Sequence, residues 1–159
     1  PPRALEKNIS VRAAKLTPPT ASLLFEQTQI EQVLINLLDN ACKFTPRNGS
    51  IEVRGYPYFW DRRFVKGATQ PERRLASSRP MNAFRVDVSD TGPGVARHLR
   101  EHIFEEYTSY SGPQDRSGGG LGLAICKLIM SRHQGHIWVE SAAAGAVFSF
   151  GLPCPRTDS

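Results

Sequence analysis

The stretch that decides the fold is QVLINLLDNACKFT, residues 32–45, because it has the period of a helix with one apolar side. The apolar side is formed by Ile30, Val33, Leu34, Leu37, Leu38 and Ala41. Asn36, Asn40 and Lys43 fall on the opposite side, within roughly 60° of one another at about 100° per residue. Asparagine is a poor interior helix residue because its amide competes for backbone hydrogen bonds. The polar side is therefore either a solvated face or a binding site, for example one with an amide oxygen for a hard cation.

The composition is that of a globular domain. With 159 residues, 40% hydrophobic and 22% charged, the chain can bury a real core as one domain over residues 1–159. No apolar run approaches the roughly 20 residues of a membrane span, and the start has no apolar signal-peptide centre. Cys42, Cys126 and Cys154 contain no C-x-x-C pair, which favours neither a disulfide framework nor a zinc site. We therefore expect a reducing, cytoplasmic compartment and no membrane contact by this chain.

Apolar periodicity and turn residues predict a mixture of strands and helices. Strands are expected over residues 9–13, 21–26, 51–60 and 84–89, and helices over 27–44, 96–104 and 121–132. A closing hairpin is expected from 137–140 to 147–152, turning around Gly145. Pro57 implies a sheet edge or a bulge where it interrupts its strand. This order predicts an α+β fold, a two-layer α/β sandwich whose mixed, mostly antiparallel sheet is covered on one face by helices.

A basic segment lies between two of the expected strands. From Arg54 to Arg85 there are eight basic residues against two acidic ones, so this segment exceeds the chain's net charge of +5. Residues 61–82 contain glycine and prolines without a clear period and are expected to form an extended hairpin tip. Its aromatic neighbours, such as Tyr58 and Trp60, would suit a nucleic-acid surface. Most basic loops are only solvated, however, so we favour an acidic protein partner or no partner, and we expect no nucleic acid.

The segment DTGPG, residues 90–94, ends the expected strand 84–89. Its two glycines and proline make a tight turn that a flat ligand can approach closely. Taken alone, the segment is a common turn. The functional interpretation is that Asp90 accepts a hydrogen bond from the exocyclic amine of adenine, whereas guanine would present a carbonyl oxygen there and be repelled.

The segment SGGGLGLAICKLIM, residues 117–130, runs from consecutive glycines directly into an apolar helix. Free backbone N–H groups and the positive end of the helix dipole would face a guest at this point, and phosphate is the expected one. An ordinary glycine-rich linker is the alternative. The segment lacks the G-x-x-x-x-G-K-[ST] pattern and does not follow a strand, so it is neither a Walker loop nor a dinucleotide fingerprint.

Together these segments resemble the catalytic, ATP-binding domain of sensor histidine kinases, in the GHKL superfamily that also holds DNA gyrase, MutL and a heat-shock chaperone. Residues 32–45 are similar to its N-box, 90–94 to its first glycine box, IFEEY at 103–107 to its F-box, and 118–123 to its second glycine box. The similarity continues through HQGHIWVES at 133–141 and FSFGLP at 148–153. The resemblance implies a Bergerat-type ATP-binding fold and the cofactors ATP and Mg²⁺.

The resemblance also implies roles for individual residues. Asn40 would ligate Mg²⁺ bridging the phosphates, Asn36 would support the phosphate end, and Lys43 would neutralise phosphate charge. Asp90 would read adenine above a floor shaped by Gly92 and Gly94. Residues 107–120 would form the ATP lid, whose one basic residue is Arg116. The nucleotide-binding set is completed by Arg116, Gly118, Gly119, Gly120, Leu121, Gly122 and Leu123.

The resemblance implies an enzyme, a protein-histidine kinase of two-component signal transduction. Hydrolysing members of the superfamily carry glutamate where this chain has Asn36, and an amide cannot deprotonate water. Transfer of the γ-phosphate to a histidine on an adjacent dimerisation/phosphoacceptor domain is therefore expected, with a response regulator as a further partner. The alternative is a non-catalytic nucleotide-sensing module of the same fold. A third class, nucleic-acid binding through the basic tip, predicts salt-dependent affinity for DNA or RNA.

Three features depart from the family pattern, and one of them is the length of the expected tip at 61–82. Glu106, Tyr107 and Thr108 stand where relatives usually continue the F-box with an aromatic and a basic residue, which bears on the lid's phosphate contact. The histidines lack the H-[ED]-x-x-x-P setting of a phosphoacceptor, and surface or structural roles are expected for His98, His102, His133 and His136. The phosphoacceptor domain is thus expected to lie outside this chain, which would be monomeric as an isolated fragment of a soluble or membrane-anchored parent kinase.

Overall fold

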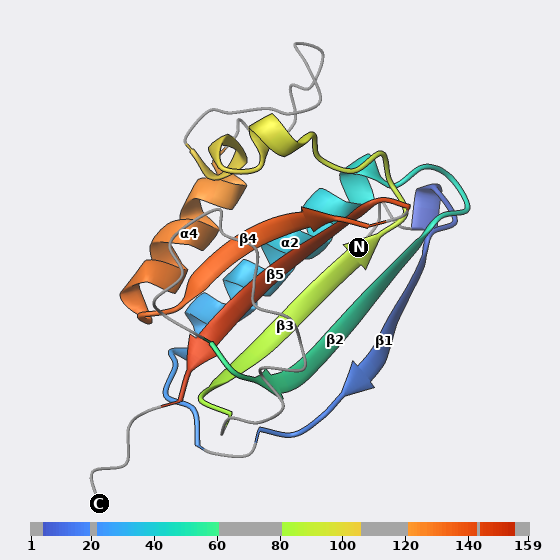
Figure 1. The fold of residues 1–159 in the computed structure, drawn as a ribbon. Helices are drawn as coiled ribbons and strands as arrows, with labels where there is room; N and C mark the ends of the chain where they lie inside the picture. The colour runs from blue at the N-terminus through green and yellow to red at the C-terminus, as the bar shows by residue number, and fades with distance from the viewer. Residues whose placement is uncertain (1–4, 20–21, 61–80, 106–120, 143, 155–159) are drawn as a thin grey trace, which may run out of the picture.

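The computed structural model describes residues 5–19, 22–60, 81–105, 121–142 and 144–154. Its centre is a five-stranded sheet in the order β1-β2-β3-β5-β4 (Figure 1). The strands are β1 (Ser10–Leu16), β2 (Ser50–Tyr58), β3 (Ala83–Asp90), β4 (His136–Ser141) and β5 (Ala146–Pro153). The β1 and β2 strands pair in parallel and every other neighbouring pair is antiparallel. The predicted mixed, mostly antiparallel sheet is therefore confirmed.

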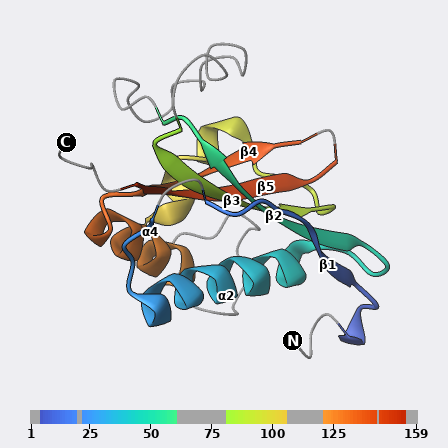
Figure 2. The same ribbon diagram turned by 90° about the horizontal axis from the view of Figure 1, so that it is seen from below.

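Two helices, α2 (Gln27–Phe44) and α4 (Gly122–Arg132), lie side by side on one face of this sheet (Figure 2). The α2 helix begins where the Glu26 carboxylate accepts a hydrogen bond from the Gln29 N–H at 2.8 Å, an N-cap interaction. Its predicted apolar side forms the centre of the core, since Val33, Leu37 and Ala41 are buried. The two-layer α/β sandwich is confirmed, and the polar side of α2 is left facing away from the sheet core.

The expected helix over 96–104 is wrong in type. The chain forms two 3₁₀ helices there, η1 (Arg97–Leu99) and η2 (His102–Phe104), and neither has a side-chain cap hydrogen bond. A nine-residue α-helix is too short to be stable without caps or extensive packing. Ile103 and Phe104, at the end of the segment, are instead buried in the core. Tertiary packing therefore overrides the helical period of this short stretch.

The strand expected over 21–26 is also wrong, because residues 22–26 form no strand. The backbone N–H of Glu26 donates to Nε2 of His133, 3.0 Å away, in place of a strand partner. The His133 Nδ1 atom lies 2.8 Å from the Ile129 carbonyl oxygen, so this ring joins the end of α4 to the start of α2. Residues 20–21 lie outside the described part of the chain.

Pro57 lies in the internal strand β2, but at a position where only one side of that strand is paired. The β1 pairing reaches only Gly55, whereas Pro57 pairs with Phe84 of β3 on the other side. The missing N–H of proline therefore costs no hydrogen bond to β1. Beyond β2, Asn82 donates to the Trp60 carbonyl and accepts from the Trp60 N–H, at 3.0 and 2.7 Å. The expected hairpin tip at 61–82 lies outside the described residues except for its last two positions.

The sheet face opposite the helices holds a polar network that links three neighbouring strands. The buried Asp87 carboxylate accepts hydrogen bonds from the Tyr56 hydroxyl and the Ser149 hydroxyl, each at 2.6 Å. It also accepts from Nε of Arg85 at 2.7 Å. Because these residues come from β2, β3 and β5, the network links the three central strands of the sheet. The β3 strand among them ends at Asp90. In the described part of the chain, no helix is both long and apolar enough to cross a membrane.

Candidate nucleotide-binding site

The polar side of α2 is engaged in specific contacts. The Asn36 amide donates from Nδ2 to the Gly122 carbonyl at 3.1 Å and accepts at Oδ1 from Gln32 Nε2 at 2.7 Å. Both Asn36 and Asn40 are half-buried. The Lys43 ammonium lies over the Phe44 ring, 5.1 Å from its centroid. Since Gly122 is 86 positions from Asn36, the structure brings the N-box and the second glycine box together.

Among the residues that the structure describes, none provides a side-chain cap for the start of α4. Leu121 at its N-cap position makes no capping hydrogen bond, and the first turn contains no acidic residue. A methyl group added at Gly122 would meet nothing within 4 Å, so the space beside this turn is open among the described residues. The Leu123 side chain is buried in the core, which leaves only its backbone available to a ligand. The positive end of the helix dipole is thus presented beside Asn36.

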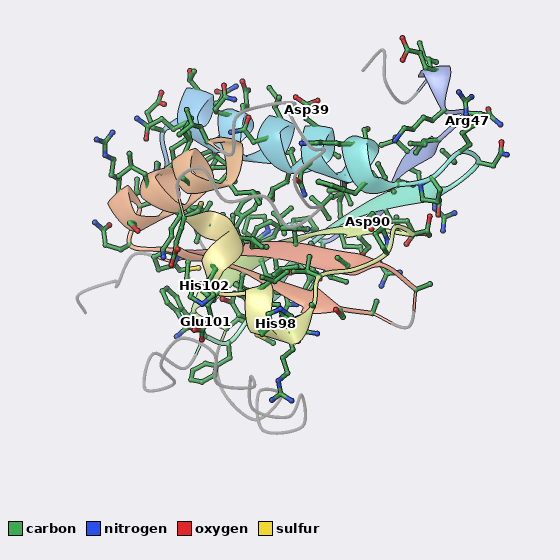
Figure 3. All side chains as sticks on the ribbon, turned by 90° about the horizontal axis from the view of Figure 1, so that it is seen from above. Asp39, Arg47, Asp90, His98, Glu101 and His102 are labelled. Atoms are coloured by element: carbon green, nitrogen blue, oxygen red, sulfur yellow. The ribbon has the colours of Figure 1, made fainter. Side chains whose placement is uncertain are left out.

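Asp90 closes β3 at the other end of α2, as Figure 3 shows. Its Oδ1 atom accepts hydrogen bonds from the Gly92 and Ala146 N–H groups, at 2.8 and 3.4 Å. Burial raises the pKa of the Asp90 carboxyl, and these two backbone hydrogen bonds offset part of that rise. A buried carboxylate with one oxygen fixed by backbone amides is well suited to accept a further hydrogen bond from a ligand.

Close backbone contacts surround Asp90. A Cβ atom at Gly92 would lie 2.8 Å from the Phe44 carbonyl oxygen, so only glycine lets this turn approach the end of α2. Gly94 has φ +81° and Gly145 has φ +98°, conformations that disfavour other residues. A Cβ atom at Gly145 would overlap the Asp90 carbonyl oxygen. Gly145 was expected only as a hairpin turn, and its place against Asp90 was missed.

A pocket of about 480 Å³ opens where the 90–94 turn meets the end of α2. Its lining is formed by Phe44, Pro93, Gly94, Val95, Ala96, Arg97, Leu99, Arg100 and Ser141. Of these, the sequence identified only Gly94 as a site residue. The remaining members come from the end of α2, the end of β4, the loop after Asp90 and the 3₁₀ segment. No periodic pattern in the sequence distinguishes such residues. Phe44 could have been identified as a pocket residue because it directly follows Lys43, which the sequence did assign to the site.

The distance between the two ends follows from helix geometry. Eight positions separate Asn36 from Phe44, which corresponds to about 12 Å at 1.5 Å per residue. The uncapped start of α4 lies at one end of this span and Asp90 with its glycine turn lies at the other. Arg116 and Gly118–Gly120, together with the lid expected at 107–120, lie outside the described residues. The second glycine segment and the 90–94 turn thus meet α2 at points about two helical turns apart.

A magnesium ion that arrives with a nucleotide would need few oxygen ligands from the protein. No group of three or more His, Cys, Asp or Glu side chains that could hold a metal occurs within the described ranges. Magnesium ions commonly take few protein oxygens and complete their octahedron with substrate phosphates and water. The Asn40 amide oxygen is the protein ligand that such an arrangement would use.

The histidines lie in structural or surface contacts. His102 pairs with Glu105 at 3.1 Å, and both side chains are more than half exposed. His98, Glu101 and His102 lie on the 3₁₀ segment, apart from Asp90 and α2 (Figure 3). His133 joins α2 to α4, and the His136 ring stacks between Trp60 and Trp138. These placements agree with the roles expected for the four side chains.

Comparison with known proteins defines the class. Residues 25–156 match the family model described as histidine kinase-, DNA gyrase B-, and HSP90-like ATPase. The chain belongs to this family. It is 38% identical over 136 residues to the adaptive-response sensory kinase SasA of Synechococcus sp. (strain JA-2-3B'a(2-13)), covering 85% of this chain and 30% of the relative. It is 32% identical over 156 residues to SasA of Rippkaea orientalis, covering 97% of this chain and 34% of the relative.

Solved structures agree with this assignment. A nucleotide-free catalytic domain of the histidine kinase ThkA superposes with a TM-score of 0.70 at 28% identity, covering 96% of this chain and 83% of that one. Full-length ShkA in complex with AMPPNP gives a TM-score of 0.68 at 28% identity, covering 99% of this chain and 28% of that one. The chain spans about a third of the length of the curated relatives it matches. It therefore corresponds to the ATPase domain of a sensor histidine kinase.

Proposed function

We propose that residues 1–159 form a single catalytic domain that binds Mg-ATP and transfers the γ-phosphate to a histidine on an adjacent dimerisation/phosphoacceptor domain. The observation that carries the proposal is the two-ended site on α2, with an uncapped helix start at Asn36 and a buried carboxylate beside Phe44. The names of the relatives support the reaction class, since they are sensory kinases. The parent kinase would act in the cytoplasm in two-component signalling.

In this proposal, one end of the site binds adenine and the other binds the phosphates. Asp90 accepts a hydrogen bond from the adenine amine, and Gly92 and Gly94 let the ring approach the backbone. Asn40 ligates the metal and Lys43 balances phosphate charge. Mg-ATP supplies the transferable phosphoryl group and the metal that neutralises it. The remaining phosphate contacts come from the second glycine box, with Leu121, Gly122 and Leu123 contributing backbone and with Arg116, Gly118, Gly119 and Gly120 completing the lid side.

The contacts of Asn36 favour transfer over hydrolysis. Both ends of its amide are used, one on Gln32 and the other on the Gly122 carbonyl. An amide has no basic lone pair for deprotonating water, so this position supplies no general base. Its role in the proposal is to hold the start of α4, and with it the glycine box, against the phosphate end. In the proposal, the acceptor nucleophile comes from another domain.

The surface of α4 suits such a domain. Leu121, Ile125 and Leu128 recur at helical spacing and are 37%, 42% and 52% exposed. An apolar stripe of this kind on a soluble domain indicates a protein contact. It starts at the phosphate end of the site, where the histidine would have to approach. A response regulator is the further partner, because one structurally similar histidine kinase was solved in complex with such a protein.

Replacing Ile125 with aspartate should slow phosphoryl transfer by about tenfold and leave ATP affinity within about twofold, because an apolar docking contact is worth one to a few kcal/mol. The rate would be followed as label from ATP appearing on the acceptor domain. Val11→Asp is the control, since Val11 is similarly exposed, at 44%, and lies on β1. If both variants slowed phosphoryl transfer equally, the α4 stripe would not be part of the interface with the acceptor domain.

Replacing Asn40 with alanine should lower the affinity for ATP by about tenfold in the presence of Mg²⁺ and change little in EDTA, because one metal ligand is lost. Circular dichroism should report an unchanged fold, since Asn40 lies on the polar side of α2. Titrations with and without Mg²⁺ measure the difference. A variant whose metal dependence matches the wild type would contradict the assignment of Asn40.

The reaction itself is tested by mixing the chain with a separately made dimerisation/phosphoacceptor domain from a SasA relative and labelled ATP. Label on the acceptor histidine supports the kinase. Tight ATP binding without transfer to any tested acceptor would instead support a nucleotide-sensing module of the same fold. Absence of ATP binding would contradict both.

A further inference from the structure

The Lys7 ammonium lies at the carboxyl end of α2. It donates hydrogen bonds to the carbonyl oxygens of Cys42, Lys43 and Thr45, at 3.1, 2.9 and 3.1 Å. A lysine ammonium has three N–H donors, so all of them are used. The last carbonyls of a helix lack partners within the helix and carry the negative end of its dipole, which favours a cation here.

These contacts surround Phe44. The one carbonyl between residues 42 and 45 that Lys7 does not bind is that of Phe44, and it lies against Gly92 in the turn that follows Asp90. Phe44 also lines the pocket at this end of the site. The backbone on both sides of Phe44 is thus held by Lys7, and its own carbonyl supports the 90–94 turn.

The chain around Lys7 is fixed to the loop after α2 by further hydrogen bonds. The Asn48 N–H donates to the Lys7 carbonyl at 2.9 Å, and the Arg47 guanidinium donates to the Glu6 carbonyl at 3.1 Å. The Asn8 amide donates to the Asn48 side chain at 2.9 Å. The segment 5–8 and the loop 45–49 therefore form one hydrogen-bonded unit.

This unit reaches the turn that holds Asp90. The Ser50 N–H, directly after the loop, donates to the Thr91 hydroxyl at 3.0 Å. A Cβ atom at Gly49 would lie 2.7 Å from the same hydroxyl oxygen, so the loop and the turn are in close contact. Hydrogen bonds and close contacts therefore connect Lys7 to the base end of the site without a break.

We propose that Lys7 is a positioning residue for the base end of the nucleotide site, acting through Phe44 and the 90–94 turn. The inference rests on the proposed function, because it assigns the adenine moiety to this end. Lys7 does not touch the pocket. Its loss would leave three helix-end carbonyls without their cation and loosen the segment that lines the pocket.

Replacing Lys7 with methionine keeps most of the unbranched side chain and removes the ammonium group with its charge. At a temperature where the variant is folded, its affinities for AMP and for Mg-AMPPNP should both fall by about tenfold, because the loss concerns the base end that the two ligands share. Arg12→Met is the matched control. It removes a cation from the neighbouring β1 strand, where Arg12 pairs with Glu52 on the surface, and should change neither affinity by more than about twofold.

Amide hydrogen exchange in the nucleotide-free protein gives an independent measurement. In Lys7→Met, exchange at Thr45 and Gly92 should be faster by about tenfold, whereas the amide of Val88 in β3 should exchange as in the wild type. A lower melting temperature with unchanged affinities would show a purely structural role and overturn the proposal. If wild-type protein bound no nucleotide, the proposed function would fail, and unchanged exchange at Thr45 and Gly92 would separately overturn the positioning role of Lys7.

Discussion

Replacing Asp90 with alanine should weaken Mg-ATP binding by about 10- to 150-fold, or about 1.5 to 3 kcal/mol, because a charge-assisted hydrogen bond to the adenine amine is lost. The carboxylate is buried, with one oxygen already fixed by the Gly92 and Ala146 amides, so little reorganisation is needed on binding. Isothermal titration calorimetry measures the change directly.

Asp39→Ala is the control for this experiment, since Asp39 is an exposed carboxylate on α2 (Figure 3). It should leave the affinity within about twofold. Asp90→Asn adds a specificity test, because its amide can donate to the carbonyl oxygen of guanine. The preference for ATP over GTP should therefore narrow in that variant. If Asp90→Ala bound ATP with the same affinity as the wild type, Asp90 would not be part of the nucleotide site.

The same residue gives the binding a pH dependence of defined sign. Burial raises the pKa of the Asp90 carboxyl, so the charged acceptor is complete only above that raised pKa. ATP affinity should fall as the pH is lowered through this raised pKa, which lies above the pKa of an exposed aspartate. The stability of the nucleotide-free protein should depend on pH in the opposite direction. Because the folded state binds this proton more tightly than the unfolded chain does, the free energy of unfolding should rise as the pH is lowered and fall as the pH rises through the raised pKa. Asp90→Asn should lack both dependences.

Replacing Gly145 with alanine should lower the free energy of unfolding by about 3 kcal/mol, which corresponds to a melting temperature about 10 °C lower for a chain of this size. The backbone at Gly145 has φ +98°, and a Cβ atom would overlap the Asp90 carbonyl oxygen. The end of β3 must shift to accommodate the methyl group. Thermal and denaturant unfolding measure the loss.

Gly122→Ala is the matched control, because a Cβ atom there meets nothing within 4 Å. Alanine at the start of α4 should leave the stability unchanged or raise it by about 0.5 to 1 kcal/mol. If Gly145→Ala were as stable as the wild type, the close approach between the β4–β5 turn and Asp90 would be wrong. Any Gly145→Ala protein that remains folded should also bind ATP more weakly, since Asp90 is displaced.

Local patterns in the sequence predicted the fold well. The bounds of α2 agree with the expected 27–44, β3 appears where alternation placed it, and β4 and β5 form the expected closing hairpin. These elements are long or strongly periodic, so their own residues determine their type. The segment 97–104 was misassigned because its conformation depends on where Ile103 and Phe104 meet the core. That information lies in distant parts of the chain.

The parts of the candidate site that can be predicted from the sequence are those with local signals. The asparagine stripe and the two glycine segments each carry their own composition, and the contacts Asn36–Gly122 and Phe44–Gly92 bring them together as expected. Lys7 and Gly145 were missed because a lysine near a turn and a glycine in a hairpin have no distinguishing local pattern. Their importance comes from contacts with residues 35 to 55 positions away.

Calorimetric titration of the wild-type chain with AMPPNP in the presence of Mg²⁺ is the most direct test of the central claim, which is that one nucleotide spans α2 from Asp90 to the start of α4. Saturable binding of one nucleotide per chain is expected, with weaker binding of the guanine analogue and a narrower preference for adenine in Asp90→Asn. Absence of binding heat with AMPPNP and Mg²⁺, with the protein folded, would contradict it.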